Sequence, residues 1–197
     1  MSITVLNRLG EAKMLGAADL KREVELGNVG NKEYVSIIPE PREFEGASID
    51  LHLGRWFLQP HQSRSTVYDF GADAENSNAF TAKEYFSPFN GEFVLHPGRF
   101  VLAITLEWIR LPSNRAAYVT GKSSLGRRGL VIETAPGVHP HFNGCLTLET
   151  TNLGEIPLKI RPRMKICQLF IHETGESPAP KGAQFSAQIK PTFGKSL

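Results

Sequence analysis

Hydroxyl, cationic and carboxylate side chains are concentrated in one stretch of the chain, residues 121–149, with the sequence GKSSLGRRGLVIETAPGVHPHFNGCLTLE. The backbone N–H groups of its first turn, its two hydroxyls and its three cations are all potential donors to an oxyanion. This pattern indicates a phosphate-binding turn, although a plain polar loop is equally compatible with it. The donors are Lys122, Ser123, Ser124, Arg127 and Arg128.

A single carboxylate lies on a predicted strand at the end of this stretch. In the run CLTLETT, residues 145–151, Leu146 and Leu148 alternate with Thr147 and Glu149. Successive strand side chains point to opposite faces, so Glu149 faces a polar cleft or solvent if the leucines face the core. A carboxylate in a cleft can act as a general acid or base, and a solvated surface glutamate is the alternative.

The histidines of the stretch do not predict a metal site. His139 and His141 are two residues apart, and no third ligand follows at a suitable spacing. The chain also lacks the His/Cys-x-Glu and Pro-Cys-x-x-Cys pattern of zinc deaminases, the P-loop, the GxSxG elbow and the GxGxxG fingerprint. We therefore expect no zinc.

Composition predicts one globular domain, residues 1–197, in a reducing setting. The net charge of +2 is too small to predict a nucleic-acid partner. Cys145 and Cys167 lie in apolar runs without a CxxC pair, which predicts buried thiols and a cytoplasmic protein. We see no run long enough to span a membrane and no signal-peptide core.

Short, regularly punctuated strands predict a mainly β fold, a barrel or sandwich with one or two short helices. Helical spacing predicts a helix over 17–26, and residues 34–39 look extended. Residues 60–90 are predicted as a long loop with at most small elements, and the tail 174–197 as mobile until something orders it. The predicted strands are 46–58, 92–96, 100–108, 116–120, 129–133, 145–151, 157–160 and 165–171.

Taken in order, these motifs resemble the dCTP deaminase branch of the dUTPase superfamily. The match runs from about residue 15 to about residue 191, nearly the whole chain. A later run, residues 162–170, and a tail element, residues 184–188, extend it beyond the catalytic strand. The main motifs are S-x-D-[LV]-x-L-G at 48–54, PG-x-x-x-LA-x-T-x-E at 97–107, G-[RK]-S-[ST]-x-x-R at 121–127, and G-x-x-x-L-E at 144–149, followed by Asn152.

The resemblance implies a dUTPase-like β-clip, a distorted β-barrel, in a homotrimer with nucleotide sites at subunit interfaces. It implies hydrolytic deamination of dCTP to dUTP and ammonia, with Mg²⁺ carried by the triphosphate and no zinc. By this likeness Glu149 is the general base, and Arg127 and Ser123 are catalytic. The substrate-binding residues implied are Lys122, Ser124, Ala135, His139, Gln168, Phe185 and Gln188.

The resemblance also divides the chain and leaves alternatives open. Residues 1–45 would form an N-terminal helix and lead-in, 46–173 the β core, and 174–197 a tail closing over the nucleotide. His139 stands where many relatives carry an acidic residue, and Arg163 and His141 stand where they carry glycine. A bifunctional enzyme that releases dUMP, or a non-catalytic nucleotide-binding regulator, remains an alternative, and dTTP remains a candidate inhibitor.

Overall fold

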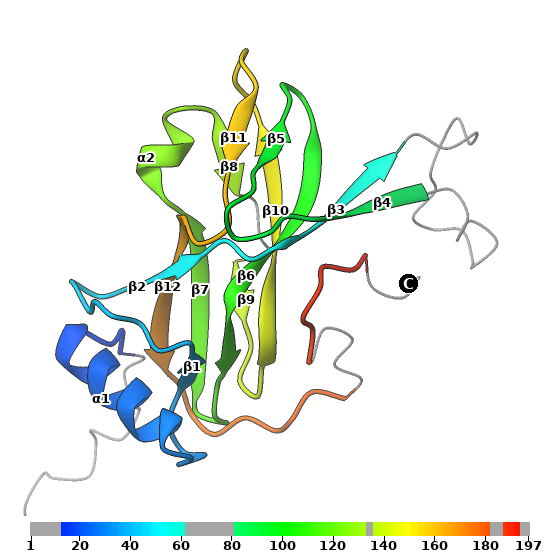
Figure 1. Ribbon diagram of the computed structural model, residues 1–197. Coiled ribbons are helices and arrows are strands. Elements are labelled where there is room, and N and C mark those ends of the chain that lie inside the picture. The colour runs from blue at the N-terminus through cyan, green and yellow to red at the C-terminus, as the bar shows by residue number, and fades with distance from the viewer. Residues whose placement is uncertain (1–12, 62–80, 133–135, 182–186, 194–197) are drawn as a thin grey trace, which may run out of the picture.

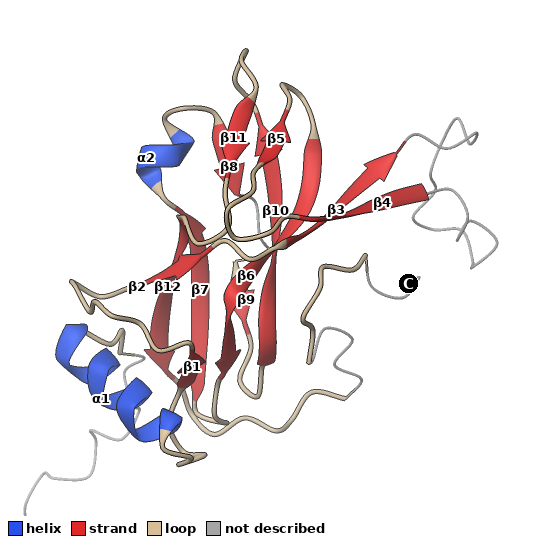
Figure 2. Ribbon diagram, in the orientation of Figure 1, coloured by secondary structure: helices blue, strands red, loops and turns tan. Residues whose placement is uncertain are grey.

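The computed structural model describes residues 13–61, 81–132, 136–181 and 187–193, and these residues form a mainly β fold (Figures 1 and 2). Two helices and twelve strands are present in the described part of the chain. They are α1 Ala17–Asn28, β1 Ser36–Ile38, β2 Ile49–His52, β3 Trp56–His61, β4 Thr81–Phe86, β5 Phe93–Leu95, β6 Phe100–Arg110, β7 Arg115–Gly121, α2 Ser123–Gly126, β8 Leu130–Ile132, β9 Gly137–Val138, β10 Asn143–Asn152, β11 Leu158–Ile160 and β12 Lys165–Glu173.

Two sheets enclose the hydrophobic core. The first has six strands in the order β4-β3-β6-β10-β8, with β1 also paired to β6, and the second has the order β2-β12-β7-β9. A small pair, β11-β5, lies at one end of the molecule (Figure 1). Alternate residues of each sheet face inward, as Leu51 and Leu148 do, and both are fully buried. The mainly β prediction is confirmed, but the described sheets stay open rather than closing into a barrel.

Helix α1 covers one edge of this core through an apolar face and one buried ion pair. Leu20 and Val24 are fully buried, as the helical spacing predicts. Glu23 lies on the same side, and its carboxylate accepts hydrogen bonds from Arg115 Nη2 at 2.6 Å and from the Val35 N–H at 3.3 Å. The helix is thereby fixed to β7 and to the segment before β1.

The central strand β10 pairs with β6 through a bulge. Their register shifts between Cys145 and Thr147, and the Thr105 hydroxyl fills the irregularity. That hydroxyl accepts the Leu146 N–H at 2.9 Å and donates to the Glu107 carbonyl at 2.9 Å. The extra residues lie on β6, so the alternation of β10 continues unbroken past the irregularity.

The strand predictions hold for most of the sheet, with three corrections. Residues 46–58 form two strands, β2 and β3. In the region 60–90, predicted as a long loop with at most small elements, β3 continues to His61 and pairs with the six-residue strand β4. Strand β4 has the sequence TAKEYF and is almost wholly exposed at the sheet edge, so it lacks the alternation that marks a half-buried strand. The single-turn helix α2 and the two-residue strand β9 were also not predicted.

Candidate active site

The outward face of β10 carries Glu149. The burial of β10 alternates strictly, with Leu146 and Leu148 buried and Thr147 and Glu149 half-buried, which confirms the predicted orientation of this strand. Glu149 pairs across the sheet with Leu102. Paired residues share a face, so the carboxylate stands over an apolar floor.

That floor was not predicted from the sequence. Leu102 and Ile104 belong to the outward face of β6, yet they are only 5% and 2% exposed. The run FVLAITLEW is apolar at consecutive positions, which is the sequence signal of a strand covered on both faces. An apolar floor beside a carboxylate suits a site that holds a flat, weakly hydrated ring.

Part of the C-terminal tail lies against β10. The Ala187 N–H donates to the Asn143 carbonyl at 2.6 Å, and the Cys145 N–H donates to the Gln188 carbonyl at 2.9 Å. The Thr147 hydroxyl donates to Gln188 Oε1 at 2.9 Å, while Gln188 Nε2 is buried and has no hydrogen-bond partner in the described part of the chain. The predicted site residue Gln188 is thus held next to Thr147, two residues from Glu149 on the same face.

The predicted phosphate-binding turn is a single helical turn, α2. Ser123, Ser124 and Arg127 are exposed there. Arg128 Nη1 donates to the Ser124 carbonyl at 2.6 Å and so belongs to the turn itself. The Arg127 guanidinium forms no hydrogen bond or ion pair with a described residue. Of the two neighbouring arginines, Arg127 is therefore the one available to an incoming anion.

Lys122 and Gln168 are attached to the four-stranded sheet. Lys122 Nζ donates to Asp50 Oδ1 at 2.5 Å, which ties the start of α2 to β2. Gln168 lies on β12 opposite Asp50, and its Nε2 donates to Ser48 Oγ at 3.1 Å. Both predicted substrate-binding side chains therefore already have protein partners, and their substrate contacts stay predictions.

The candidate residues fall into two groups on different sides of the chain. Helix α2 and the segment 187–193 lie on opposite flanks of the molecule in Figure 1. The α2 group is fixed to β2 through the Lys122–Asp50 pair, whereas Glu149 shares its face with the residues that contact the tail. A single chain thus presents the donors of the turn and the carboxylate of β10 at separate surfaces.

Several residues of the motifs that carry the family resemblance have structural roles. Asn152 is fully buried, and its Nδ2 donates to the carbonyls of Leu95 at 2.9 Å and Ile156 at 2.8 Å. Its Oδ1 accepts the Gly154 N–H at 2.9 Å. At Gly54 a Cβ atom would lie 2.8 Å from the Ile104 carbonyl, so only glycine fits this crossing of β6. Such residues shape the site without touching it.

The remaining predicted site residues lie in an exposed turn or outside the described residues. His139 is exposed in the turn between β9 and β10, and its carbonyl accepts the Phe142 N–H at 3.2 Å. Ala135 and Phe185 lie outside the described residues. Within the described ranges, no group of three or more His, Cys, Asp or Glu residues is arranged to hold a metal ion.

The two cysteines are free thiols with different environments. Cys167 is fully buried, as predicted, whereas Cys145 is half-buried because it points outward on β10. Burial, reinforced by the charge of Glu107, raises the pKa of Cys145 to about 11. Cys145 is therefore a poor nucleophile at neutral pH, although it lies close to the tail.

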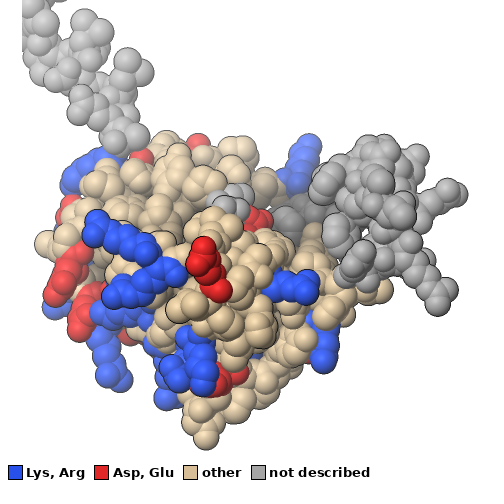
Figure 3. Space-filling view, turned by 90° about the horizontal axis from the view of Figure 1, so that it is seen from above, with Lys and Arg blue, Asp and Glu red and all other residues tan. Residues whose placement is uncertain are grey.

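The surface charge is unevenly distributed. Viewed from the end that carries β5 and β11, basic side chains are more numerous on the flank that carries α2 in Figure 1 (Figure 3). A local excess of cations on this flank suits a small polyanion better than a long nucleic acid, since the chain's net charge is only +2. None of the helices in the described ranges has the length and apolar character needed to cross a membrane.

Comparison with known proteins matches this chain to one family. The family model described as dCTP deaminase-like matches residues 14–174. The "dCTP deaminase, dUMP-forming" of Methanothermobacter thermautotrophicus is 34% identical over 170 residues, covering 85% of this chain and 82% of the relative. The protein of the same name from Mycobacterium tuberculosis is 36% identical over 193 residues, covering 93% of this chain and 95% of the relative.

A solved structure shares the fold. The 2'-deoxycytidine 5'-triphosphate deaminase from Agrobacterium tumefaciens superposes with a TM-score of 0.58 over 82% of this chain, at 20% identity. This chain covers 48% of that longer chain. At such identity the likeness concerns the fold alone, and it agrees with the open, mainly β architecture described above.

Proposed function

The chain belongs to the dCTP deaminase-like family, and from this membership we propose that it hydrolytically deaminates dCTP and carries the product on to dUMP. The observation that carries the proposal is Glu149, a half-buried carboxylate over the apolar floor of Leu102 and Ile104. The regulator alternative would not need a carboxylate held in this way.

In the proposed reaction, Glu149 takes a proton from a water molecule as that water attacks C4 of the cytosine ring. The same carboxyl gives that proton to N3, then takes the proton of the new C4 hydroxyl and passes it to the departing amine. The C4–N4 bond breaks, ammonia leaves, and the ring becomes uracil. Leu102 and Ile104, which are already covered within one chain, would keep this side of Glu149 apolar and limit the access of bulk water.

The proposed site is composite, with Ser123 and Arg127 supplied by a second copy of the chain. The separation of α2 from the Glu149 face within one chain supports this arrangement, as does an Arg127 guanidinium without a partner among the described residues. Ser123 would position the water or Glu149, and Ser124 would donate to phosphate oxygens. We propose a homotrimer, as the resemblance implies, because a closed ring places each α2 turn against the next copy.

Magnesium enters this proposal as part of the substrate. The triphosphate oxygens of dCTP would carry Mg²⁺, and Arg127 would neutralise charge beside it. Independence from zinc stays a prediction for a chelation experiment. On the face of β10 that carries Glu149, the Thr147 hydroxyl and the Gln188 amide are polar groups of a kind that zinc does not prefer.

The product assignment follows the relatives rather than the sequence expectation of dUTP. Both relatives named above are described as dUMP-forming. Formation of dUMP requires a second water to attack the α-phosphorus, so that the Pα–O–Pβ bond breaks and pyrophosphate leaves. His139 stands where the resemblance expects an acidic residue, and its exposed turn gives it freedom to contact the sugar.

Incubation of the purified protein with dCTP and Mg²⁺, followed by chromatography, tests this function. We expect ammonia, dUMP and pyrophosphate, with turnover that survives a zinc-specific chelator and is lost with EDTA. Accumulation of dUTP alone would restrict the activity to deamination. Saturable binding of dCTP without any product would overturn the enzymatic assignment in favour of the regulator.

A further inference from the structure

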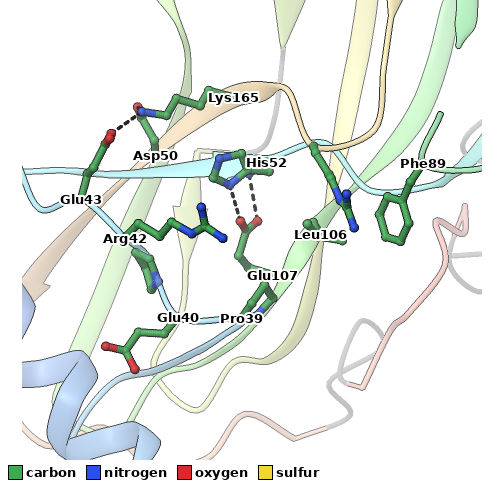
Figure 4. A pocket seen from close by; sticks show the side chains of 12 residues that line it. Pro39, Glu40, Arg42, Glu43, Asp50, His52, Phe89, Leu106, Glu107 and Lys165 are labelled. Carbon is green, nitrogen blue, oxygen red and sulfur yellow. Dashed lines mark hydrogen bonds and ion pairs between the residues drawn. The ribbon is translucent and has the colours of Figure 1, made fainter. Parts of the chain in front are cut away.

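A cavity of about 720 Å³ lies apart from the residues assigned to catalysis (Figure 4). It forms where β2, β6 and β12 meet the segment 39–43, and Ser123, Arg127 and Glu149 are not among its lining residues. The volume lies within the range of pockets that hold metabolites and cofactors. The side chains that line it include Arg42, Glu107, Phe89, Arg163, His52 and Lys165.

Most charges in this cavity neutralise one another. Lys165 Nζ donates to Glu43 Oε2 at 2.6 Å and lies 3.3 Å from Asp50 Oδ2. Asp50 also receives the hydrogen bond from Lys122. Figure 4 shows Lys165, Glu43 and Asp50 close together along one wall. They hold the wall together and leave little charge for a ligand.

Glu107 and His52 form a second satisfied group. Glu107 is 3% exposed, its Oε2 accepts the His52 N–H at 2.9 Å, and its Oε1 lies 2.6 Å from His52 Nδ1. Burial raises the pKa of the Glu107 carboxyl, and the hydrogen bonds from His52 oppose this shift. The floor of the cavity is therefore polar but internally paired.

Two arginines remain without a counter-ion. Neither Arg42 nor Arg163 forms a hydrogen bond or an ion pair through its guanidinium with any described residue. The Arg42 guanidinium points into the cavity beside Glu107 in Figure 4. The Arg163 guanidinium stacks on the Phe89 ring, 3.9 Å from its centroid, which leaves its edge N–H donors available. Against these two guanidinium groups stands one lining carboxylate, Glu40, without an ion pair among the described residues, so the cavity keeps a cationic surplus that suits an oxyanion.

Arg163 occupies a position where its backbone favours glycine. Its φ is 71°, in the left-handed region, and the resemblance to relatives places glycine here. A non-glycine side chain at such a strained position motivates the hypothesis that the side chain has a use. Stacking on an exposed phenylalanine accounts for the orientation of the guanidinium but not for its unused donors.

We propose that this cavity is a second ligand site, which binds a phosphate-bearing small molecule through Arg42 and Arg163. The phosphate oxygens would take the edge donors of both guanidiniums. Pro39, Pro41 and Leu106 provide apolar walls for the remainder of the ligand. The phosphate comes either from a free anion such as pyrophosphate or from a nucleotide monophosphate, and both present the same dianionic group.

The site is connected to the tail by a continuous stack of rings and cations. Arg55 lies between the Phe86 and Phe89 rings, 4.2 and 4.4 Å from their centroids. Phe86 packs on Trp56 with a centroid distance of 4.7 Å, and Lys190 of the tail lies 3.8 Å from the Trp56 centroid. A ligand that draws Arg163 away from Phe89 acts on one end of this stack, so Trp56 is a built-in optical reporter of binding.

Calorimetric titration of the full chain with pyrophosphate and, separately, with dTMP tests the proposal. The measurement uses the wild type and an Arg127→Gln background in which the proposed active site is impaired. Arg42→Gln and Arg163→Gly remove the two donors, and glycine at 163 relieves the backbone, so loss of folding does not confuse the result. Arg22→Gln, on the exposed side of α1, is the matched loss of one positive charge.

We expect one binding event to persist in the Arg127→Gln background and to weaken at least about tenfold in each pocket variant. It should be unchanged in Arg22→Gln and should carry a tryptophan fluorescence change that Arg163→Gly abolishes. A stronger response to dTMP than to pyrophosphate would assign the site to nucleotides, and the reverse to the free anion. Binding that is absent, or equal in Arg42→Gln and Arg22→Gln, would overturn the proposal. Because binding is measured, the result stands whether or not dCTP is deaminated.

Discussion

If the active site is shared between two copies of the chain, two inactive variants should restore activity when they are mixed. Glu149→Gln removes the proposed base, and Arg127→Gln removes the proposed partner cation. In a mixed oligomer, an intact site forms wherever a copy with native Glu149 meets a copy with native Arg127. Neither parent provides this combination alone, so complementation reports directly on the separation of α2 and the Glu149 face.

The expected yield follows from random assembly. For a fraction f of one variant, the fraction of intact sites is f(1 − f), which is about a quarter of the wild-type number at equal mixing and about a tenth at a nine-to-one ratio. The same curve holds for any closed ring in which each site joins two neighbours. Activity should therefore peak at equal amounts and fall symmetrically on either side.

The assay is co-refolding at several ratios, followed by ammonia release from dCTP, with exchange verified by mass spectrometry of tagged heteromers. A matched control dilutes the wild type with an equal amount of the double variant. A shared site leaves about a quarter of the sites intact there, whereas a site within one chain leaves about half. Verified heteromers with no activity above the parents, together with half activity in the control, would refute the composite site.

Four further changes test separate parts of the structure. Glu149→Gln alone should lower kcat by at least about 10³-fold without loss of folding, measured by steady-state kinetics and circular dichroism; near-normal turnover would contradict its role as base. Asn152→Ala should lower the free energy of unfolding by about 3 kcal/mol in urea titrations, since three hydrogen bonds of this buried side chain, about 1 kcal/mol each, are lost; a change below ~1 kcal/mol would mean that other groups replace them. Burial raises the pKa of Glu107 above its ordinary 4.5. Its contribution to the free energy of unfolding is therefore present below pH 4.5 and is lost as pH rises through the folded-state pKa. Glu107→Gln should remove this decline in urea titrations, and an identical pH dependence of unfolding in both proteins would contradict it. Cys145, with a pKa of about 11, should react with a thiol reagent much more slowly at neutral pH than a free model thiol, and faster as pH rises; rapid labelling at neutral pH would show that the tail contact is broken in solution.

The sequence predicts the architecture well where strand alternation is clean. The alternation of Leu146, Thr147, Leu148 and Glu149 identifies both the strand and the outward carboxylate, and both hold. The exposed edge strand β4 was missed because charged residues on both faces erase that signal. The split of residues 46–58 into β2 and β3 was missed for a different reason. Gly54 makes a close crossing over β6 that depends on a partner distant in sequence.

The sequence identifies the candidate residues of the site but not their positions relative to one another. The motif around Ser123 and Arg127 and the motif around Glu149 are each visible in the sequence, yet nothing in their spacing shows that they face different flanks. Lys122 illustrates the same limit. Its type and position suggest a phosphate ligand, while its pairing with Asp50 depends on a strand about seventy residues earlier.

Hydrogen-bond saturation separates structural polar groups from those available to ligands. Asn152, Thr105 and Glu107 are buried with protein partners, and their replacement should cost stability before it costs chemistry. Arg127 and Gln188 Nε2 retain unused donors, one on each side of the chain. If a bound nucleotide and a second copy of the chain complete the site, such donors are expected to be unsatisfied in one isolated copy. The same criterion identifies the arginines of the second cavity, so the proposal of a second ligand site rests on the same physical grounds as the proposed active site.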